Sequence, residues 1–424
     1  SEELFSDSEI ALYTEQLKRH ARYLADDKNY LKNQNHGLFQ DKALLFLGYF
    51  FKNQEWIELS KKRLLGQWNF LFTDEMVCVE NSFTYQYVNK LLFVDIFKIL
   101  KQFGEETDFL KNKLIQAEEF IGYALMPDAY GAPFGDSIRS DYSSCECLDK
   151  EGVFAFSSRK GKMGKKPDER SRIYPKAGYY FGREFWDPAD GPQKDGRFED
   201  ATWVMFRSGY LSITHRQADD NSFILYSKGQ DIFVDSGFYS YMFRNPIRRY
   251  LRSANAHNTV IVDGVSFPFL RSDLIGFSGI LYHELNREKQ ADYVVGYNLL
   301  YHGVCHIRHF LFLKEAVFIL DELTSCYEHR YSQLFHCGKA LQPLIVSDKE
   351  MLASISETDS YVRIKQLETE NQLFVHLING AAPGAEYGIL SELRDQYEYI
   401  YTLRFDAAGK NVQFATMITI ENHE

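Results

Sequence analysis

The sequence lacks any long apolar run: nowhere among its 424 residues do eighteen consecutive apolar residues occur. We therefore expect no segment that spans a membrane. It also lacks a basic excess, because 48 Lys and Arg residues stand against 59 Asp and Glu residues, a formal charge of −11. Binding to nucleic-acid phosphates calls for basic surface, so we expect no nucleic-acid partner.

Cysteine is scarce, with six residues that show no zinc-finger spacing and are too few for a disulfide scaffold in a chain of this length. The only close pair is Cys145 and Cys147, for which a redox or metal role is the less favoured interpretation. Cysteine usage therefore leaves the cellular compartment open. The chain opens without a basic or apolar leader, so we expect a signal peptide to be absent or already removed.

Aromatic residues are plentiful, at 16 % of the chain, and apolar residues make up 45 %. That much apolar surface can offset the entropy of ordering a long chain, which excludes general disorder. The length predicts two or three domains.

The first 130 residues have the pattern of helices and are predicted to form one helical domain. Ser6 and Glu9 have the spacing of a capping box, and apolar residues then recur every three or four positions. Further helices are predicted at 38–51, 56–72, 85–103 and 109–125, joined by short polar connectors as in helical hairpins. Five helices make a thin domain, so we expect further helices upstream.

The pattern changes after Met126, where prolines and glycines interrupt the helical spacing. We interpret residues 131–174 as a linker with a mobile, Lys- and Arg-rich loop. Residues 175–424 show short runs of Val, Ile, Tyr and Phe between turn residues, without helical segments among them. This pattern predicts an antiparallel β-sandwich domain.

The stretch 213–264 is the most informative for chemistry. It contains His215, an Asp235-Ser-Gly turn, four arginines and an Ala256-His-Asn-Thr segment. The polar residues interrupt the strand patterns instead of lining one alternating face, which indicates side chains that converge on a site. The alternative is that Asp235-Ser-Gly is an ordinary turn.

This stretch resembles the heparinase II/III-like family of polysaccharide lyases, and within it the heparinase III branch. Members carry a His, a polar loop, a strand, an Asp-x-Gly turn and an AHNT strand that ends in VDG. The resemblance covers roughly residues 10 to 330. The matching segments here are Asn35-His-Gly-Leu, Glu80-Asn-Ser-Phe-Thr-Tyr85, Tyr174-Pro-Lys-Ala-Gly, His215-Arg-Gln-Ala-Asp, Asp235-Ser-Gly and Ala256-His-Asn-Thr-Val-Ile-Val-Asp-Gly.

The resemblance implies an α+β multidomain fold, with a truncated α/α toroid followed by a large antiparallel β-sandwich. It implies β-elimination on a uronic-acid-containing polysaccharide. This reaction needs a neutralised carboxylate, a base for the C5 proton and an acid for the departing O4. Matching by residue gives Asn35 and His36 for neutralisation, Tyr85 as the acid and a candidate base, and His215 as the base or carboxylate partner.

Each of these residues also has an ordinary structural interpretation. Asn35 has the residue type of a helix N-cap, His36 and His215 are interpretable as surface residues, and Tyr85 as a half-buried aromatic residue. A second tyrosine is sought among Tyr239, Tyr241 and Tyr250. The sequence pattern does not distinguish the three, and Tyr241 is the one that we predict to be catalytic.

Two further sets follow from the same segments. Glu80 belongs to the element that carries Tyr85 and is predicted to bind substrate. Arg248, Arg249 and Arg252 lie, with Arg244, in the densest basic cluster near the motifs. We expect these arginines to form a cationic strip that binds an anionic substrate, or else a plain solvated loop.

The resemblance also implies a metal site. Several family members bind a metal through an H-x-H, an Asp and the His of AHN, and here Gln217, Asp235 and His257 are in register. An amide in place of an imidazole favours a harder cation. We expect one divalent cation, calcium or zinc, in a structural role. The alternative is a hydrogen-bonded polar core without an ion.

The function predicted is a polysaccharide lyase with an acidic polysaccharide as its partner. The alternative from another class is a non-catalytic protein that binds acidic glycans or assists exopolysaccharide assembly, with the same architecture. A metal-dependent hydrolase is a weaker alternative. The resemblance implies a periplasmic, secreted or cell-surface location, although a cytoplasmic one stays open. The oligomeric state is not predicted.

Overall fold

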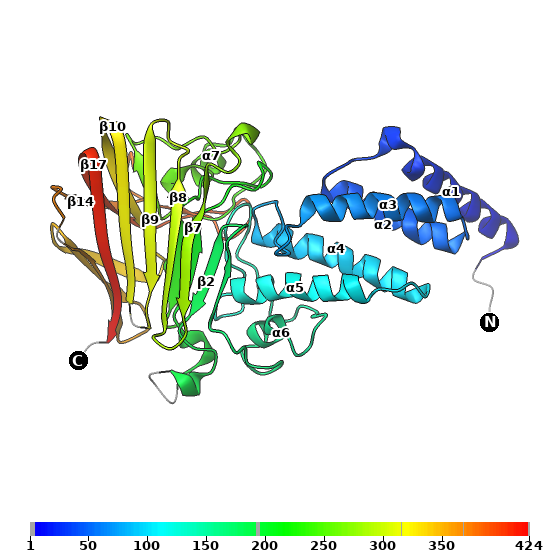
Figure 1. The fold of residues 1–424 in the computed structure, drawn as a ribbon, viewed down its shortest axis with the longest axis horizontal. Coiled ribbons are helices and arrows are strands. Elements are labelled where there is room, and N and C mark those ends of the chain that lie inside the picture. Colours follow the sequence, from blue (N-terminus) through cyan, green and yellow to red (C-terminus); the bar gives the residue numbers. More distant parts are fainter. Residues whose placement is uncertain (1–4, 192–195, 315, 368, 423–424) are drawn as a thin grey trace. The chain divides into compact units, whose positions relative to one another are not determined.

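The computed structural model describes residues 5–191, 196–314, 316–367 and 369–422. Helices dominate the first part of the sequence and antiparallel strands the rest (Figure 1), so the α+β class is confirmed. The helices are α1 (Asp7–Ala25), α2 (Asn35–Phe50), α3 (Gln54–Leu71), α4 (Phe83–Gln102), α5 (Asp108–Ala124), α6 (Val153–Ser158) and α7 (Pro246–Leu251). No described helix is long and apolar enough to cross a membrane.

The strands form two large antiparallel sheets and one small one. The five-stranded sheet contains β1 (Ser171–Tyr174), β2 (Tyr179–Arg183), β3 (Trp203–Arg207), β4 (Ser222–Ser227) and β5 (Gln230–Phe233). The ten-stranded sheet contains β6 (Val260–Val262), β7 (Ser278–Asn286), β8 (Ala291–Asn298), β9 (Val304–Phe312), β10 (Ala316–His336), β11 (Leu341–Ser347), β12 (Glu350–Ile355), β13 (Ser360–Gln366), β14 (Phe374–Asn379) and β17 (Tyr401–Asn422). The small sheet pairs β15 (Ile389–Leu390) with β16 (Glu398–Tyr399).

The chain forms two compact units. The first comprises residues 1–79 and 87–117, and the second comprises residues 80–86 and 118–424. The short segment 80–86 therefore belongs with the sheets, although helical sequence surrounds it. The domain boundaries proposed from the sequence, at residues 130 and 174, stay a prediction; the segment between them contains α6.

The helical unit begins at the expected capping box. The Glu9 N–H donates to Ser6 Oγ at 3.4 Å, and the Ser6 N–H donates to the Glu9 carboxylate at 2.8 Å, which satisfies two orphan donors at the start of α1. Asn53 caps α3 with a single bond, because its side chain accepts from the Trp56 N–H at 3.0 Å. The helices predicted from the 3.6-residue period are confirmed.

The five-stranded sheet is buried on both faces, and all residues of β2, β3 and β4 are buried. Its outer face packs against the C-terminal turns of α5, where Phe120 contacts Tyr179 and Phe181 edge-on at about 5.4 and 5.3 Å between ring centroids. Two covered faces explain why these strands contain near-continuous apolar runs instead of alternating ones.

The inner face of this sheet packs on the ten-stranded sheet and forms a sandwich. Phe206 and Phe223 each contact Phe310 across the interior, at 5.3 and 5.8 Å between ring centroids. Along β9, buried and partly exposed residues alternate, as expected for a strand with one face on a core. One continuous apolar core therefore joins the two sheets.

The sequence predicted short strands, and here the structure differs. β10 and β17 have 21 and 22 residues and pair with each other over most of their length (Figure 1). Their register shifts between Thr324 and His329, where the ladder is irregular. The first apolar run ends near residue 320 because the next inward position of β10 is the polar Asp321, which is buried in an ion pair with Arg308.

Candidate active site

The segment 80–86 carries Tyr85 and is fixed to the sandwich unit by short polar side chains. The Asn81 side-chain amide donates to the carbonyl oxygens of Ser212 and Thr214, at 3.0 and 3.1 Å. The Ser82 hydroxyl lies 2.8 Å from that of Ser137. These bonds join the two residues just before α4 to two loops, one just before His215 and one that contains Ser137.

Tyr85, His215 and Tyr241 converge in this place. The rings of Tyr85 and His215 stack, with centroids 3.6 Å apart and planes 13° apart. The hydroxyl oxygens of Tyr85 and Tyr241 are 2.6 Å apart, a short hydrogen bond. Of the three candidate loop tyrosines, Tyr241 is thus the one whose hydroxyl meets that of Tyr85. Tyr85 and Tyr241 are 156 positions apart in sequence, and the fold joins their hydroxyl groups by a hydrogen bond.

Asp136 lies behind His215 and holds it in place. His215 Nδ1 is 3.2 Å from Asp136 Oδ2, and Arg248 Nη2 donates to both carboxylate oxygens at 2.7 Å. The Gln217 side-chain amide also donates to Asp136 Oδ1, at 3.2 Å. Asp136 is 4 % exposed, so this carboxylate acts through buried, charge-assisted bonds.

The backbone around His215 is tightly constrained. His215 has a left-handed φ of 52°, unusual for a residue with a Cβ, and its carbonyl oxygen accepts from the Asp136 N–H at 3.1 Å. Gly135 has a φ of 62°, and a Cβ there would overlap the Asn81 carbonyl oxygen. Strained positions of this kind persist only where the surroundings enforce them, and they are concentrated at functional sites.

The pKa values of the two tyrosines and of the Asp136 carboxyl are shifted in opposite directions. Burial, together with the bond to Tyr241 and the negative charges of Glu80 and Asp136, raises the pKa of the Tyr85 hydroxyl well above its ordinary value. Burial raises the pKa of Tyr241 as well. Burial alone would also raise the pKa of Asp136, but the bond with His215 and the charge of Arg248 lower it below its usual value. At neutral pH the group therefore consists of two phenols and one carboxylate.

Three further predicted residues are Asn35 and His36, for neutralisation, and Glu80, for substrate binding. Asn35 and His36 open α2 in the helical unit, where Asn35 is partly buried and His36 is exposed. The N-cap position of α2 is Gln34, so Asn35 is not the cap. Glu80 is 3 % exposed. The roles of these residues stay predictions.

The surface strip of four arginines predicted from the sequence is not formed. Arg248 and Arg252 are 1 % and 7 % exposed, whereas Arg244 and Arg249 are exposed. The cause is helix α7, which places residues four apart on the same face, here the inward one together with Leu251. Arg248 then binds Asp136, and Arg252 donates to the carbonyl oxygen of Arg216 at 3.0 Å.

The three predicted metal ligands are all buried in the sandwich unit. Asp235 Oδ2 lies 2.8 Å from His257 Nδ1, while His257 Nε2 and Gln217 Oε1 are buried without a hydrogen-bond partner. Gly237 connects the set, because its N–H donates to Asp235 and its carbonyl accepts from Gln217. In the described ranges, no three His, Cys, Asp or Glu side chains form a group that could hold a metal.

Two residues of this site escaped the sequence analysis. Asp136 stands in the stretch where prolines and glycines interrupt the helical spacing, and a single Asp after a Gly carries no local signal. Arg394 lies on the connection between β15 and β16, with its guanidinium carbon 5.5 Å from the centre of the Tyr241 ring. Nothing in the sequence near residue 394 resembles a motif.

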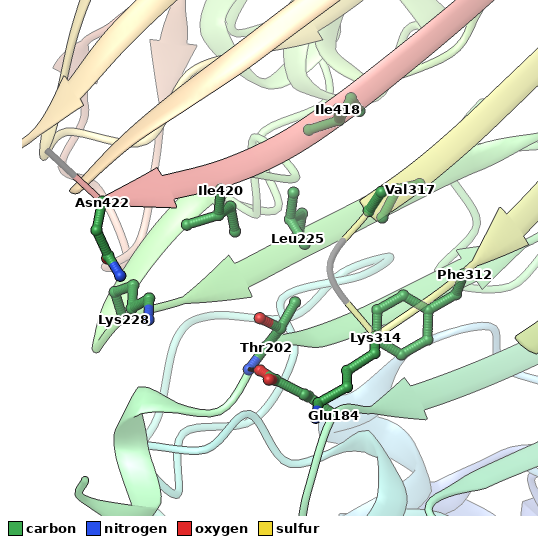
Figure 2. A pocket seen from close by; sticks show the side chains of 11 residues that line it. Glu184, Thr202, Leu225, Lys228, Phe312, Lys314, Val317, Ile418, Ile420 and Asn422 are labelled. Atoms are coloured by element: carbon green, nitrogen blue, oxygen red, sulfur yellow. Dashed lines mark hydrogen bonds between the residues drawn. The ribbon is translucent and has the colours of Figure 1, made fainter. Parts of the chain in front are cut away.

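A separate pocket of about 180 Å³ contains none of the predicted site residues (Figure 2). Its lining comes from strands of both sheets and from the loops next to them. The residues are Glu184, Thr202, Leu225, Lys228, Phe312, Lys314, Ala316, Val317, Ile418, Ile420 and Asn422. The predicted chemistry is therefore not located in this pocket.

Comparisons with known proteins give consistent results. A heparin-sulfate lyase of Pedobacter heparinus is 22 % identical over 312 residues, which are 69 % of this chain and 44 % of that protein. One of Bacteroides stercoris is 21 % identical over 313 residues, with the same shares. The chain thus spans less than half the length of these curated relatives.

The fold is shared with a solved structure. The heparan sulfate lyase HepC from Pedobacter heparinus superposes with a TM-score of 0.80 at 17 % identity, over 98 % of this chain and 64 % of that one. The sequence profile of the heparinase II/III N-terminus matches residues 1–161, and that of the heparinase II/III-like C-terminal region matches residues 166–396. The chain belongs to the heparinase II/III family.

Proposed function

We propose that this protein is a polysaccharide lyase that cleaves a uronic-acid-containing polysaccharide by β-elimination. The observation that carries the proposal is the group of Tyr85, Tyr241 and His215, with the two hydroxyls 2.6 Å apart and the imidazole stacked at 3.6 Å. Such a group supplies both an acid and a base within one site, which the reaction needs. Relatives named heparin-sulfate lyases support an acidic glycan as the substrate.

In this proposal the acid comes from the tyrosine pair. The raised pKa of Tyr85 keeps its hydroxyl protonated at neutral pH, so the pair begins each cycle able to donate a proton to the departing O4. The hydrogen bond between the hydroxyls allows Tyr241 to restore the proton after Tyr85 has given it up. Tyr241 is 39 % exposed, which connects the pair to solvent.

His215 is the base in the same scheme. When Nδ1–H donates to the ionised Asp136, Nε2 carries a lone pair, the form that can accept the C5 proton. Asp136 then also stabilises the imidazolium that results. Arg248 keeps Asp136 ionised and in place and is itself too buried to be a main substrate contact.

We propose that the helical hairpins belong to an incomplete α/α toroid.

We further propose that Asn35 and His36 neutralise the substrate carboxylate, and the family motif is the only support for this assignment. Amide and imidazole donors suit a carboxylate on which charge builds up as the C5 proton leaves.

We also propose that Gln217, Asp235 and His257 hold one divalent cation, calcium or zinc, in a structural role. The residues fit a metal, because two buried atoms that can coordinate a cation, Gln217 Oε1 and His257 Nε2, have no hydrogen-bond partner. Asp235 fixes the His257 tautomer through Nδ1 and so directs Nε2 to a ligand. A bound cation would neutralise the buried carboxylate and order the loop that carries His215.

The lyase proposal is tested by mixing the protein with a panel of uronate polysaccharides and recording ultraviolet absorbance. Elimination leaves a conjugated C4–C5 double bond, which absorbs, whereas hydrolysis or binding leaves none. A rise in absorbance on at least one acidic glycan is expected. Binding without any rise would favour the alternative, a non-catalytic protein that binds acidic glycans.

A further inference from the structure

The connection between β15 and β16, residues 391–397, is fixed directly against the loop that carries Tyr241. The Ser391 N–H donates to the Ser236 carbonyl at 3.0 Å, and the Asp395 N–H donates to the Tyr239 carbonyl at 2.9 Å. Ser391 is fully buried, and its hydroxyl donates to the carbonyl oxygen of Phe238. The connection is therefore a built part of the site and not a free surface loop.

This connection presents one cation beside the reacting group. The side chain of Arg394 is 64 % exposed, and its guanidinium carbon lies 5.5 Å from the centre of the Tyr241 ring. The Tyr241 hydroxyl in turn lies 2.6 Å from that of Tyr85. A group bound to Arg394 thus lies close to Tyr241, one of the two proposed proton donors, and one side chain away from Tyr85.

The acidic neighbours leave this guanidinium available. Glu392 pairs with Lys339 at 2.5 Å and with Arg139 at 3.6 Å, and Glu398 pairs with Lys339 at 3.1 Å. The ion pair of Arg394 with Asp395 spans 3.9 Å, at the limit for such contacts, and both side chains are about two-thirds exposed. Ion pairs of this kind are worth little and are readily exchanged for a better anion.

Two exposed aromatic rings follow Arg394 in sequence, at the end of the connection and in β16. Tyr397 and Tyr399 are 40 % and 53 % exposed and contact each other edge-on, with centroids 5.6 Å apart. Tyr397 also contacts Tyr239 at 6.0 Å. Tyrosine rings with one free side provide apolar contact for a sugar and keep a polar tip in water.

We infer that Arg394, with Tyr397 and Tyr399 beside it, binds an anionic substituent on a sugar next to the bond that is cleaved. This inference rests on the proposed function of the site. A planar guanidinium forms paired hydrogen bonds to a carboxylate or a sulfate, so either group satisfies the chemistry. In a protein with a formal charge of −11, a local cation is what allows a polyanion to approach the tyrosine pair.

The test compares Arg394→Gln with Arg394→Lys, and uses Lys410→Gln as the matched control, an exposed cation on β17. Binding is measured by calorimetry in a Tyr85→Phe background, so that turnover does not consume the ligand. The ligands are an unsulfated uronate–hexosamine polysaccharide and its sulfated counterpart. Circular dichroism checks that each variant is folded.

Arg394→Gln is expected to weaken binding by roughly tenfold or more, as loss of a charge-assisted bond predicts, with Arg394→Lys in between. An equal loss on both polymers identifies a carboxylate partner, and a loss on the sulfated polymer alone identifies a sulfate. Unchanged binding in Arg394→Gln, or an equal loss in Lys410→Gln, overturns the inference. Because binding is measured, a wild-type protein that binds but releases no unsaturated product contradicts the lyase proposal and not this one.

Discussion

At the scale of single residues, the proposed chemistry depends most on one hydroxyl. Tyr85→Phe keeps the ring that stacks on His215 and removes the oxygen that bonds Tyr241. We expect kcat on an acidic glycan to fall by about 10²–10⁴-fold, with a smaller change in KM, because general acid help is lost while the fold is kept. Steady-state ultraviolet assays measure both constants. Tyr239→Phe is the control, and a wild-type kcat in Tyr85→Phe would show that the acid lies elsewhere.

A second residue-scale prediction concerns the buried carboxylate. Asp136→Ala leaves Arg248 buried without its partner, and we expect the free energy of unfolding to fall by about 3–5 kcal/mol. Asp273→Ala, which breaks an exposed pair with Arg271, is expected to change little. Urea unfolding monitored by circular dichroism compares the two. Equal stability of both variants would mean that the Asp136 pair contributes nothing.

Sequence reasoning at this scale depended on motifs, and its limits are physical. Tyr85 and His215 were identified because the family pattern names them. Asp136 was not identified, because its function arises from a turn at Gly135 and from contacts with residues about 80 and 112 positions away. A loop Asp has many ordinary uses, so only the folded chain distinguishes this one.

At the scale of elements, helix α2 carries a carboxyl whose ionisation opposes folding. Burial raises the pKa of Asp41 to about 7, although the Tyr30 hydroxyl, at 2.7 Å, and Arg63 both favour its charged form. The unfolded carboxyl ionises near pH 4. Between about pH 4 and 7 the folded state keeps a proton that the unfolded state has lost, so the free energy of unfolding of this unit falls as pH rises.

Asp41→Asn is expected to remove that slope, since an amide does not titrate but still accepts from Tyr30. Helical circular dichroism during urea unfolding at pH 5 and pH 7.5 measures it. Asp95→Asn serves as the matched control on α4, because Asp95 is half exposed and pairs only at the surface with Lys42. A slope that survives in Asp41→Asn would assign it to other groups.

The elements themselves were predictable to different degrees. The helices of the first unit were found because capping residues and a sustained 3.6-residue period are local signals. The lengths of β10 and β17 were not, and in β10 the first apolar run ends where the polar Asp321 takes an inward position. The short helix α7 was missed as well, and with it the inward direction of Arg248 and Arg252, since six residues are too few for a periodic pattern.

At the scale of the whole molecule, the cation proposal predicts a change in thermal stability. Purified protein is expected to contain about one divalent cation per chain, held by Gln217, Asp235 and His257. Its removal by a chelator should lower Tm by several degrees, since a ligand at 100 times its Kd stabilises by about 2.7 kcal/mol. Metal analysis and calorimetry give the two numbers. The proposal would be contradicted if the purified wild-type protein contained no bound metal and Asp235→Ala had the same Tm as the wild type.

The order of strands in the large sheet has a consequence for how the protein folds. β17 lies between β13 and β10, so it joins the group β11–β13 to the group β7–β10, yet it follows all of them in sequence. Until it pairs, β10 and β13 both present open edges, the kind that pair with strands of other chains. A substitution or truncation that prevents β17, residues 401–422, from pairing would therefore expose two strand edges at once. We expect such a variant to aggregate in a cell instead of showing a partial loss of activity.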